Sequence, residues 1–201
     1  MKHPDNILEV GALLPDYMGF IFWGKSARYF DGIIPKLPRS IKKVGVFVNA
    51  SIEEILEEIK THDLQAIQLH GDESVEFCEL LKKNIPNLID IIKVFSILDT
   101  FDFAILNSYE NVCDFFLFDT KGKLPGGNGT TFDWEVLKKY PSTKPFFLSG
   151  GIGLKEMDAV NEILKTNLPV YAIDVNSKFE IEPGLKNTQL CKDVINHVQK
   201  K

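Results

Sequence analysis

Seven short apolar runs, rich in residues that favour β-strands, recur along the chain. They begin at residues 17, 44, 66, 91, 115, 146 and 172, so successive starts lie 22 to 31 residues apart. Continuous apolar runs, as opposed to alternating ones, are typical of strands buried on both faces. The spacing leaves room for a return helix between parallel strands. The pattern therefore predicts seven strand–helix units.

The segments between these runs have helical periodicity. Ser51 and Glu54 form a capping box, and apolar residues then recur at helical spacing from Ile52 to Ile59. The same periodicity appears in residues 191–198 and in residues 7–14, which precede the first apolar run. The chain is therefore predicted to open on a helix and to close on one.

Repeating strand–helix units of this length form either an open doubly wound sheet or a (β/α)8 barrel. A barrel has eight strands and begins with a strand, whereas this chain opens on a helix. The periodicity leaves both folds open, the second as a barrel without its first strand. No linker or low-complexity stretch divides the chain, so residues 1–201 are expected to form a single domain.

Composition narrows the functional classes. The 201 residues are 44% hydrophobic and 25% charged, as in globular proteins. Basic residues number 23 against 28 acidic ones, without a basic cluster, which argues against nucleic-acid binding. The longest apolar run, Tyr17–Trp23, is too short for a membrane helix, and no secretory signal opens the chain. Three cysteines without metal-ligand spacing fit reduced thiols, so we expect a cytoplasmic protein.

Polar residues and glycines collect where the predicted strands end, which is where parallel α/β folds place their sites. Gly150 and Gly151 follow one strand, and Asn176 and Ser177 follow the last. Glycines let backbone N–H groups converge on an anion, and barrels commonly bind phosphate in their last two loops. The glycines, including a further group at 126–129, are either a phosphate site or tight turns.

Three side chains at these strand ends are candidates for chemistry. Asp119 ends an apolar strand, where desolvation could raise its pKa toward use as a general acid; the alternative is a helix cap or an ion pair with a nearby lysine. His70 is either a proton carrier or a structural residue. Arg28 could clamp a carboxylate through two parallel hydrogen bonds, although most loop arginines are only solvated.

Several segments occur together in a recognisable order: DYMGFIFWGKSARY, QLHGDE, LPGGNGTTFDW, FFLSGGI and IDVNSKFEIEPGLK. With these motifs the chain resembles the phosphoribosylanthranilate isomerase family of tryptophan biosynthesis over almost its whole length. The resemblance implies a (β/α)8 barrel. It also implies an Amadori rearrangement of N-(5-phosphoribosyl)anthranilate to 1-(2-carboxyphenylamino)-1-deoxyribulose 5-phosphate, without metal or organic cofactor.

The resemblance also implies roles for individual residues. Asp119 falls on the family's general acid, and Arg28 on the arginine that meets the anthranilate carboxylate. The remaining matches line the pocket (His70, Asp174) or bind phosphate (Gly150, Gly151, Asn176, Ser177). The expected partner is a small phosphorylated molecule, with neither nucleic acid nor membrane, and the expected state is a monomer or weak homodimer.

The family's base is a cysteine in a Lys-x-Cys-Gly segment that ends the first strand, and the resemblance places this segment ahead of Met1. The three cysteines in the chain are expected elsewhere. Cys78 should lie within a helix, Cys113 before a strand at the rim of the barrel opposite the site, and Cys191 on the last helix. The alternative function is therefore an impaired or inactive barrel, such as a non-catalytic phosphate-binding relic. A third possible function is that of another phosphate-binding barrel, for instance an indoleglycerol-phosphate synthase or a pentose-phosphate epimerase.

Overall fold

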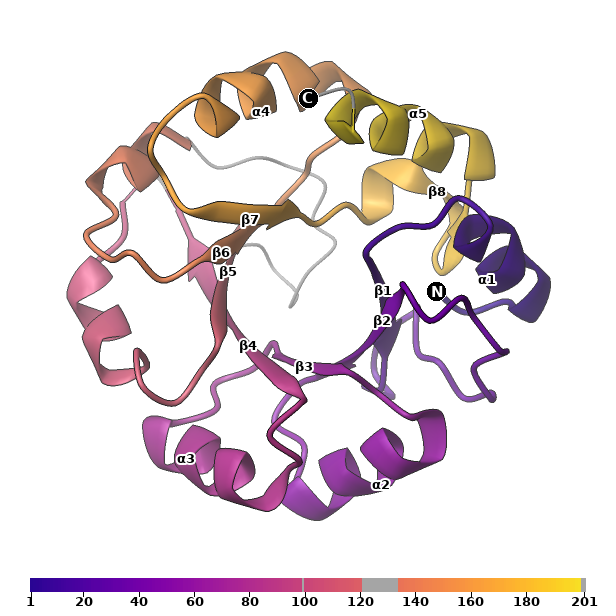
Figure 1. Ribbon diagram of the computed structural model, residues 1–201, viewed down its shortest axis with the longest axis horizontal. Helices are drawn as coiled ribbons and strands as arrows, with labels where there is room; N and C mark the ends of the chain where they lie inside the picture. The colour runs from indigo at the N-terminus through magenta and orange to yellow at the C-terminus, as the bar shows by residue number, and fades with distance from the viewer. Residues whose placement is uncertain (99, 121–133, 200–201) are drawn as a thin grey trace.

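A single curled sheet of parallel strands forms the centre of the protein. The computed structural model describes residues 1–98, 100–120 and 134–199. In these residues seven strands pair in chain order, each parallel to the next. They are β1 (Tyr17–Ile21), β2 (Lys42–Phe47), β3 (Ala66–Leu69), β4 (Asp90–Ile97), β5 (Phe115–Thr120), β6 (Phe146–Leu148) and β7 (Val170–Ile173). Figure 1 shows the strands ringed by helices, so the predicted barrel architecture is confirmed.

The strands alternate their side chains between two apolar layers. One layer fills the interior of the curled sheet and contains Val44, Ala66, Ile92, Val94, Leu117 and Phe147. The other packs against the surrounding helices and includes Phe47, Ile67, Leu69, Phe116 and Phe146. Because both faces are buried, the strands read as continuous apolar runs, and each observed strand begins within two residues of its predicted start.

The helices lie outside the sheet: α1 (Pro4–Gly11), α2 (Ile52–His62), α3 (Val75–Asn84), α4 (Met157–Leu164) and α5 (Thr188–Gln199). The predicted capping box starts α2, because the Ser51 hydroxyl accepts from the Glu54 N–H and the Glu54 carboxylate accepts from the Ser51 N–H. The predicted first helix is present, although it begins at Pro4 and ends at Gly11. The last helix is confirmed as well.

The prediction of a helix after every strand is wrong for some connections. Residues 22–41, which join β1 to β2, form no helix; Gly24, Gly32, Pro35 and Pro38 interrupt this segment. After β4 the described residues form a 3₁₀ helix, η1 (Phe103–Ser108), and before β6 another, η2 (Trp134–Lys139).

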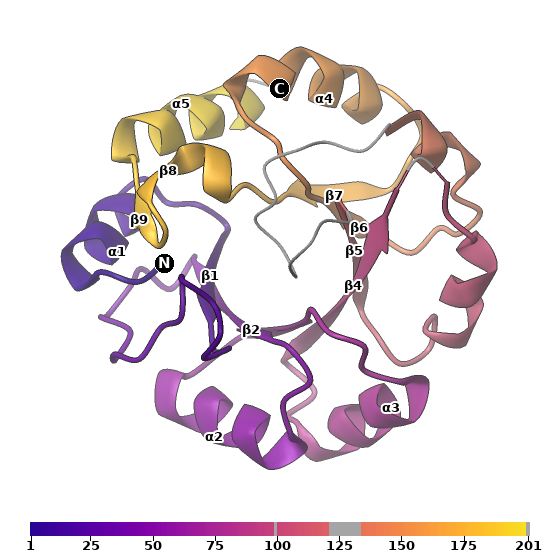
Figure 2. The same cartoon turned by 180° about the vertical axis from the view of Figure 1, so that it is seen from behind.

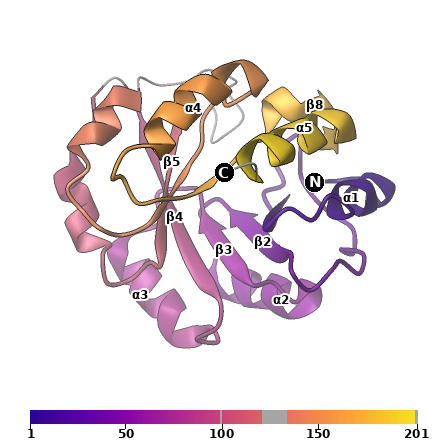
Figure 3. The same cartoon turned by 45° about the horizontal axis from the view of Figure 1, so that its top comes forward.

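The edge strands β1 and β7 approach through side chains. The Tyr17 and Tyr171 hydroxyls are 3.4 Å apart, and both rings pack near Phe147. Outside this edge, α1 lies against α5 (Figure 3). A hairpin of β8 (Glu180–Glu182) and β9 (Leu185–Lys186) also contacts α1 beside the N-terminus (Figure 2). The hairpin thus brings a segment that follows β7 into contact with the first helix of the chain.

Candidate active site

A cavity of about 380 Å³ opens inside the curled sheet and reaches the carboxyl ends of the strands. Seven of the eight predicted site residues line it: His70, Asp119, Gly150, Gly151, Asp174, Asn176 and Ser177. The eighth, Arg28, is not among the lining residues, although Ser26, two positions earlier, is one. The strand ends therefore converge as the sequence predicted.

His70 and Asp119 face each other across this cavity. The His70 Nε2 lies 3.4 Å from the Asp119 Oδ2, and both side chains are about nine-tenths buried. The amide nitrogen of Gln68 lies 2.9 Å from the His70 Nδ1 and donates to it. In the neutral ring the proton therefore sits on Nε2, which makes no hydrogen bond within the described residues although the Asp119 Oδ2 is 3.4 Å away. The Asp119 Oδ1 accepts from the Thr120 N–H at 2.8 Å, which fixes the carboxylate.

Asp174 is a second carboxyl in the cavity, and it is half-buried. Burial raises its pKa, and the negative charge of Asp119 raises it further. The Ser149 hydroxyl donates to the Asp174 Oδ2 at 2.8 Å and opposes this rise. Asp174 is thus a carboxyl that holds a proton to higher pH than an ordinary aspartate. Ser149 and Gln68 were not predicted as partners. Gln68 lies in β3, two positions before His70, and Ser149 directly follows β6.

The turn after β6 requires glycine. Gly150 has φ of 94° and Gly151 has φ of 63°, in the left-handed region that favours glycine. A Cβ at Gly150 would lie 2.7 Å from the Thr120 backbone nitrogen, too close for any side chain. Such turns can direct successive N–H groups toward an anion. The other predicted glycine group, at 126–129, lies outside the described residues.

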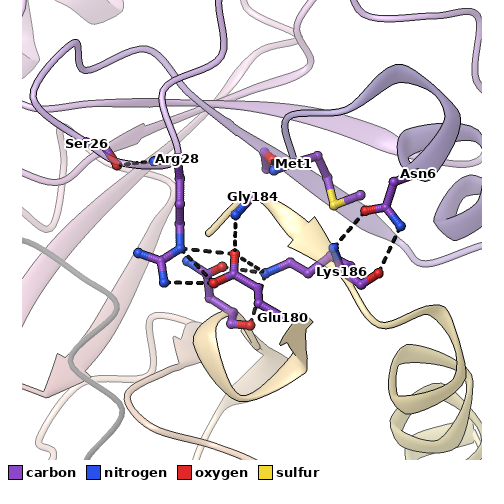
Figure 4. Close-up of polar contacts among 9 residues, drawn as sticks. Met1, Asn6, Ser26, Arg28, Glu180, Gly184 and Lys186 are labelled. Carbon is purple, nitrogen blue, oxygen red and sulfur yellow. Dashed lines mark hydrogen bonds and ion pairs between the residues drawn. The ribbon is translucent and has the colours of Figure 1, made fainter. Parts of the chain in front are cut away.

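Arg28 is held by an acidic partner that sequence reasoning missed. Its Nε and Nη2 donate to both carboxylate oxygens of Glu180 at 2.7 to 3.0 Å (Figure 4). Within the described residues its Nη1 has no partner. Glu180 also accepts from the Gly184 N–H and from the Lys186 Nζ. No local pattern in the sequence signals this contact, because Arg28 and Glu180 lie 152 positions apart along the chain.

The cysteines lie where they were expected. Cys78 is in α3, Cys113 directly precedes β5, and Cys191 is in α5; all three are buried and unpaired. Cys191 also lines the cavity, and burial raises its pKa. Among the described residues no group of three or more histidines, cysteines and acids is placed to hold a metal ion. None of the helices in that part of the chain is long and apolar enough to span a membrane.

Comparison with known proteins places this chain and its fold in one family. Residues 2–197 match the model of N-(5'-phosphoribosyl)anthranilate (PRA) isomerase. The N-(5'-phosphoribosyl)anthranilate isomerase of Parabacteroides distasonis is 42% identical over 205 residues, covering 98% of this chain and 90% of that protein. The crystal structure of the enzyme from Thermotoga maritima has a TM-score of 0.81 at 27% identity, covering 100% of this chain and 96% of that one.

A second solved structure holds a ligand. It is a phosphoribosyl anthranilate isomerase in complex with reduced 1-(o-carboxyphenylamino)-1-deoxyribulose 5-phosphate, with a TM-score of 0.77 at 27% identity. The match covers 100% of this chain and 96% of that chain.

Proposed function

The chain belongs to the N-(5'-phosphoribosyl)anthranilate isomerase family, and from this premise we propose how its site residues share the reaction. Its function is the Amadori rearrangement of N-(5-phosphoribosyl)anthranilate in tryptophan biosynthesis, an aldose–ketose isomerisation. Identity of 42% over nearly the whole chain favours this activity over an inactive relic or another phosphate-binding barrel.

The rearrangement needs one acid and one base. The acid protonates the furanose ring oxygen, so that the C1–O bond breaks and the ring opens to a Schiff base. The base then removes the C2 proton, and the resulting enol tautomerises to the ketone. One proton goes to the ring oxygen bonded to C1 and the other leaves the neighbouring C2, so the acid must lie inside the cavity between the two anionic ends of the substrate.

Asp119 is the proposed acid. The observation that carries this role is its place in the cavity near the carboxyl end of β5, where the Thr120 N–H fixes it and the His70 Nε2 lies 3.4 Å away. After Asp119 gives up its proton, the His70 N–H can stabilise the carboxylate that remains. Asp174, which Ser149 orients, completes this polar wall.

The two ends of the substrate are anions, and different residues are proposed to bind them. Gly150, Gly151, Asn176 and Ser177 are proposed to hold the phosphate, supported by the positive φ values of the glycines. Arg28 is proposed to bind the anthranilate carboxylate through its Nη1, since Glu180 accepts from its other nitrogens. We also propose a cytoplasmic location, supported by three free thiols. The base is not assigned within the 201 residues, which contain no Lys-x-Cys-Gly segment.

Asp119→Asn tests the acid. In a chain extended ahead of Met1 by a first strand that ends in Lys-x-Cys-Gly, its kcat is expected to fall by roughly 10²- to 10⁴-fold relative to the extended parent, the contribution of one positioned proton donor. Asp158→Asn, at an exposed aspartate of α4, is the matched control and should keep parental turnover. Steady-state kinetics with N-(5-phosphoribosyl)anthranilate measure both. Near-parental turnover in Asp119→Asn would transfer the acid role to His70 or Asp174.

A further inference from the structure

Arg28 and Asn176, which lie at the two proposed anion-binding ends, are connected by one network through Glu180 and Lys186. Figure 4 shows Arg28, Glu180 and Lys186. Arg28 donates to Glu180, and the Glu180 Oε1 accepts from the Lys186 Nζ at 3.1 Å. The same Nζ donates to the Asn176 backbone carbonyl at 3.0 Å and to its side-chain Oδ1. Two side chains of the β8–β9 hairpin thus bridge a residue after β1 and a residue after β7.

The bridge is buried and held from behind. The Glu180 and Lys186 side chains are 5% and 9% exposed. Although burial alone would raise the pKa of Glu180, hydrogen bonds from Arg28 and the charge of Lys186 lower it, so it stays ionised. The Lys186 backbone is clamped by Asn6 of α1, whose Oδ1 accepts from its N–H at 2.7 Å and whose Nδ2 donates to its carbonyl at 2.9 Å. Buried ion pairs need such supporting hydrogen bonds to persist.

Each contact fixes the direction of a group that can bind an anion. Because the Asn176 Oδ1 accepts from Lys186, the Asn176 amide is oriented with its Nδ2 hydrogens left to donate. Because Glu180 holds the Nε and Nη2 of Arg28, the guanidinium plane is fixed and Nη1 remains for a carboxylate. Neither Glu180 nor Lys186 needs to touch the substrate to have this effect.

We propose that Glu180 and Lys186 are positioning residues that couple the carboxylate-binding and phosphate-binding ends of the site, so that loss of one link loosens both ends. This inference rests on the proposed function, because it takes Arg28 and Asn176 as the substrate-binding ends. It adds two residues that no motif at the strand ends indicated, and it gives the hairpin a role in substrate orientation.

Calorimetric titration with inorganic phosphate and, separately, with anthranilate tests the coupling without requiring turnover. Lys186→Met should weaken phosphate binding by about 10- to 100-fold, the effect of losing a charged hydrogen-bond donor. Glu180→Gln should weaken binding of both probes, including phosphate, although Glu180 is not among the residues that line the cavity. The double variant should bind phosphate about as weakly as Lys186→Met alone, because both changes break the same link.

Control variants separate this role from a general loss of structure. Glu182→Gln changes an exposed glutamate of the same hairpin, and Lys192→Met an exposed lysine of α5; both should bind as the parent does. Lys186→Arg keeps the positive charge and should therefore bind phosphate more tightly than Lys186→Met. This comparison tests the role of the charge even if Lys186→Met folds poorly. In kinetics, KM should rise more than kcat falls, because the Glu180 carboxylate and the Lys186 Nζ bind Arg28, Asn176 and each other and are given no proton transfer in the proposed reaction.

The outcomes are distinct. If the parent protein binds neither probe, the proposed anion sites are wrong and the coupling falls with them. If the parent binds both probes but Glu180→Gln leaves phosphate affinity unchanged, or if the two effects simply add, only the coupling is overturned.

Discussion

Buried acids behave differently in this protein because their partners differ. Glu73 accepts from the Lys93 Nζ at 3.1 Å and from the backbone N–H groups of Asn49 and Gly71, so its charge is well compensated. Within the described residues the Asp174 carboxyl accepts one hydrogen bond, from Ser149, and it lies near the charge of Asp119. Asp174 is therefore the acid for which ionisation opposes folding.

Asp174→Asn is expected to stabilise the folded protein at neutral pH. The folded-state pKa of Asp174 lies above its ordinary value of 3.8, so the folded state binds this proton more tightly than the unfolded chain does. In the parent, stability is therefore lost as the pH rises from about the ordinary value through the raised one. The variant has no carboxyl at position 174 that could ionise, so its stability lacks this pH dependence. Its Tm should exceed the parent's at pH 7, by roughly 2–4 °C for each kcal/mol gained in the free energy of unfolding. This difference in Tm should shrink toward pH 4.

Thermal unfolding monitored by circular dichroism from pH 4 to pH 7 measures this difference. Asp158→Asn, exposed on α4, should show no such trend. A variant less stable than the parent at pH 7 would mean that the Ser149 hydrogen bond outweighs the burial of the charge.

At the scale of elements, the strands were predictable because burial on both faces leaves a strong apolar signal. The site residues on them were predictable too, because side chains two apart share a face and strand ends share an edge. The connection from β1 to β2 was not predictable from the spacing of the strands, which left room for a helix, because its glycines and prolines disfavour one. Glu180 was missed for another reason: it meets Arg28 from 152 positions along the chain, and no local pattern encodes that contact.

The turn after β6 offers a test at this scale. Gly150→Ala should destabilise the protein by about 1–3 kcal/mol, because its φ is positive and its Cβ would lie 2.7 Å from the Thr120 nitrogen. Since the turn also forms the proposed phosphate site, phosphate affinity should fall as well. Gly24→Ala is the control, because no neighbouring atom lies within 4 Å of its Cβ position. Urea unfolding and phosphate titration measure both effects; parental values for Gly150→Ala would contradict the required turn geometry.

At the scale of the whole molecule, the two edges of the sheet decide how the barrel closes. In the described residues β1 pairs with β2 and β7 with β6, and the edges meet through Tyr17 and Tyr171. The α1 and α5 helices and the Asn6–Lys186 hydrogen bonds tie the chain ends together outside this seam. Closure therefore relies on side chains and on the outer layer more than on a continuous ladder.

A strand added ahead of Met1 and ending in Lys-x-Cys-Gly is expected to enter this seam. The Met1 nitrogen donates to the Gly19 carbonyl of β1 at 2.9 Å, so residues attached to it would start beside β1. Each new ladder hydrogen bond contributes about 0.5–1.5 kcal/mol, and each apolar side chain buried in the cavity about 1.5–3 kcal/mol. The extended chain should therefore melt several degrees higher and show a higher kcat, whereas the same extension with alanine for cysteine should raise the melting temperature alone. Calorimetry and isomerase kinetics on the three proteins distinguish these effects. Equal melting temperatures would show that the seam accepts no strand, and equal turnover with cysteine or alanine would show that the base lies elsewhere.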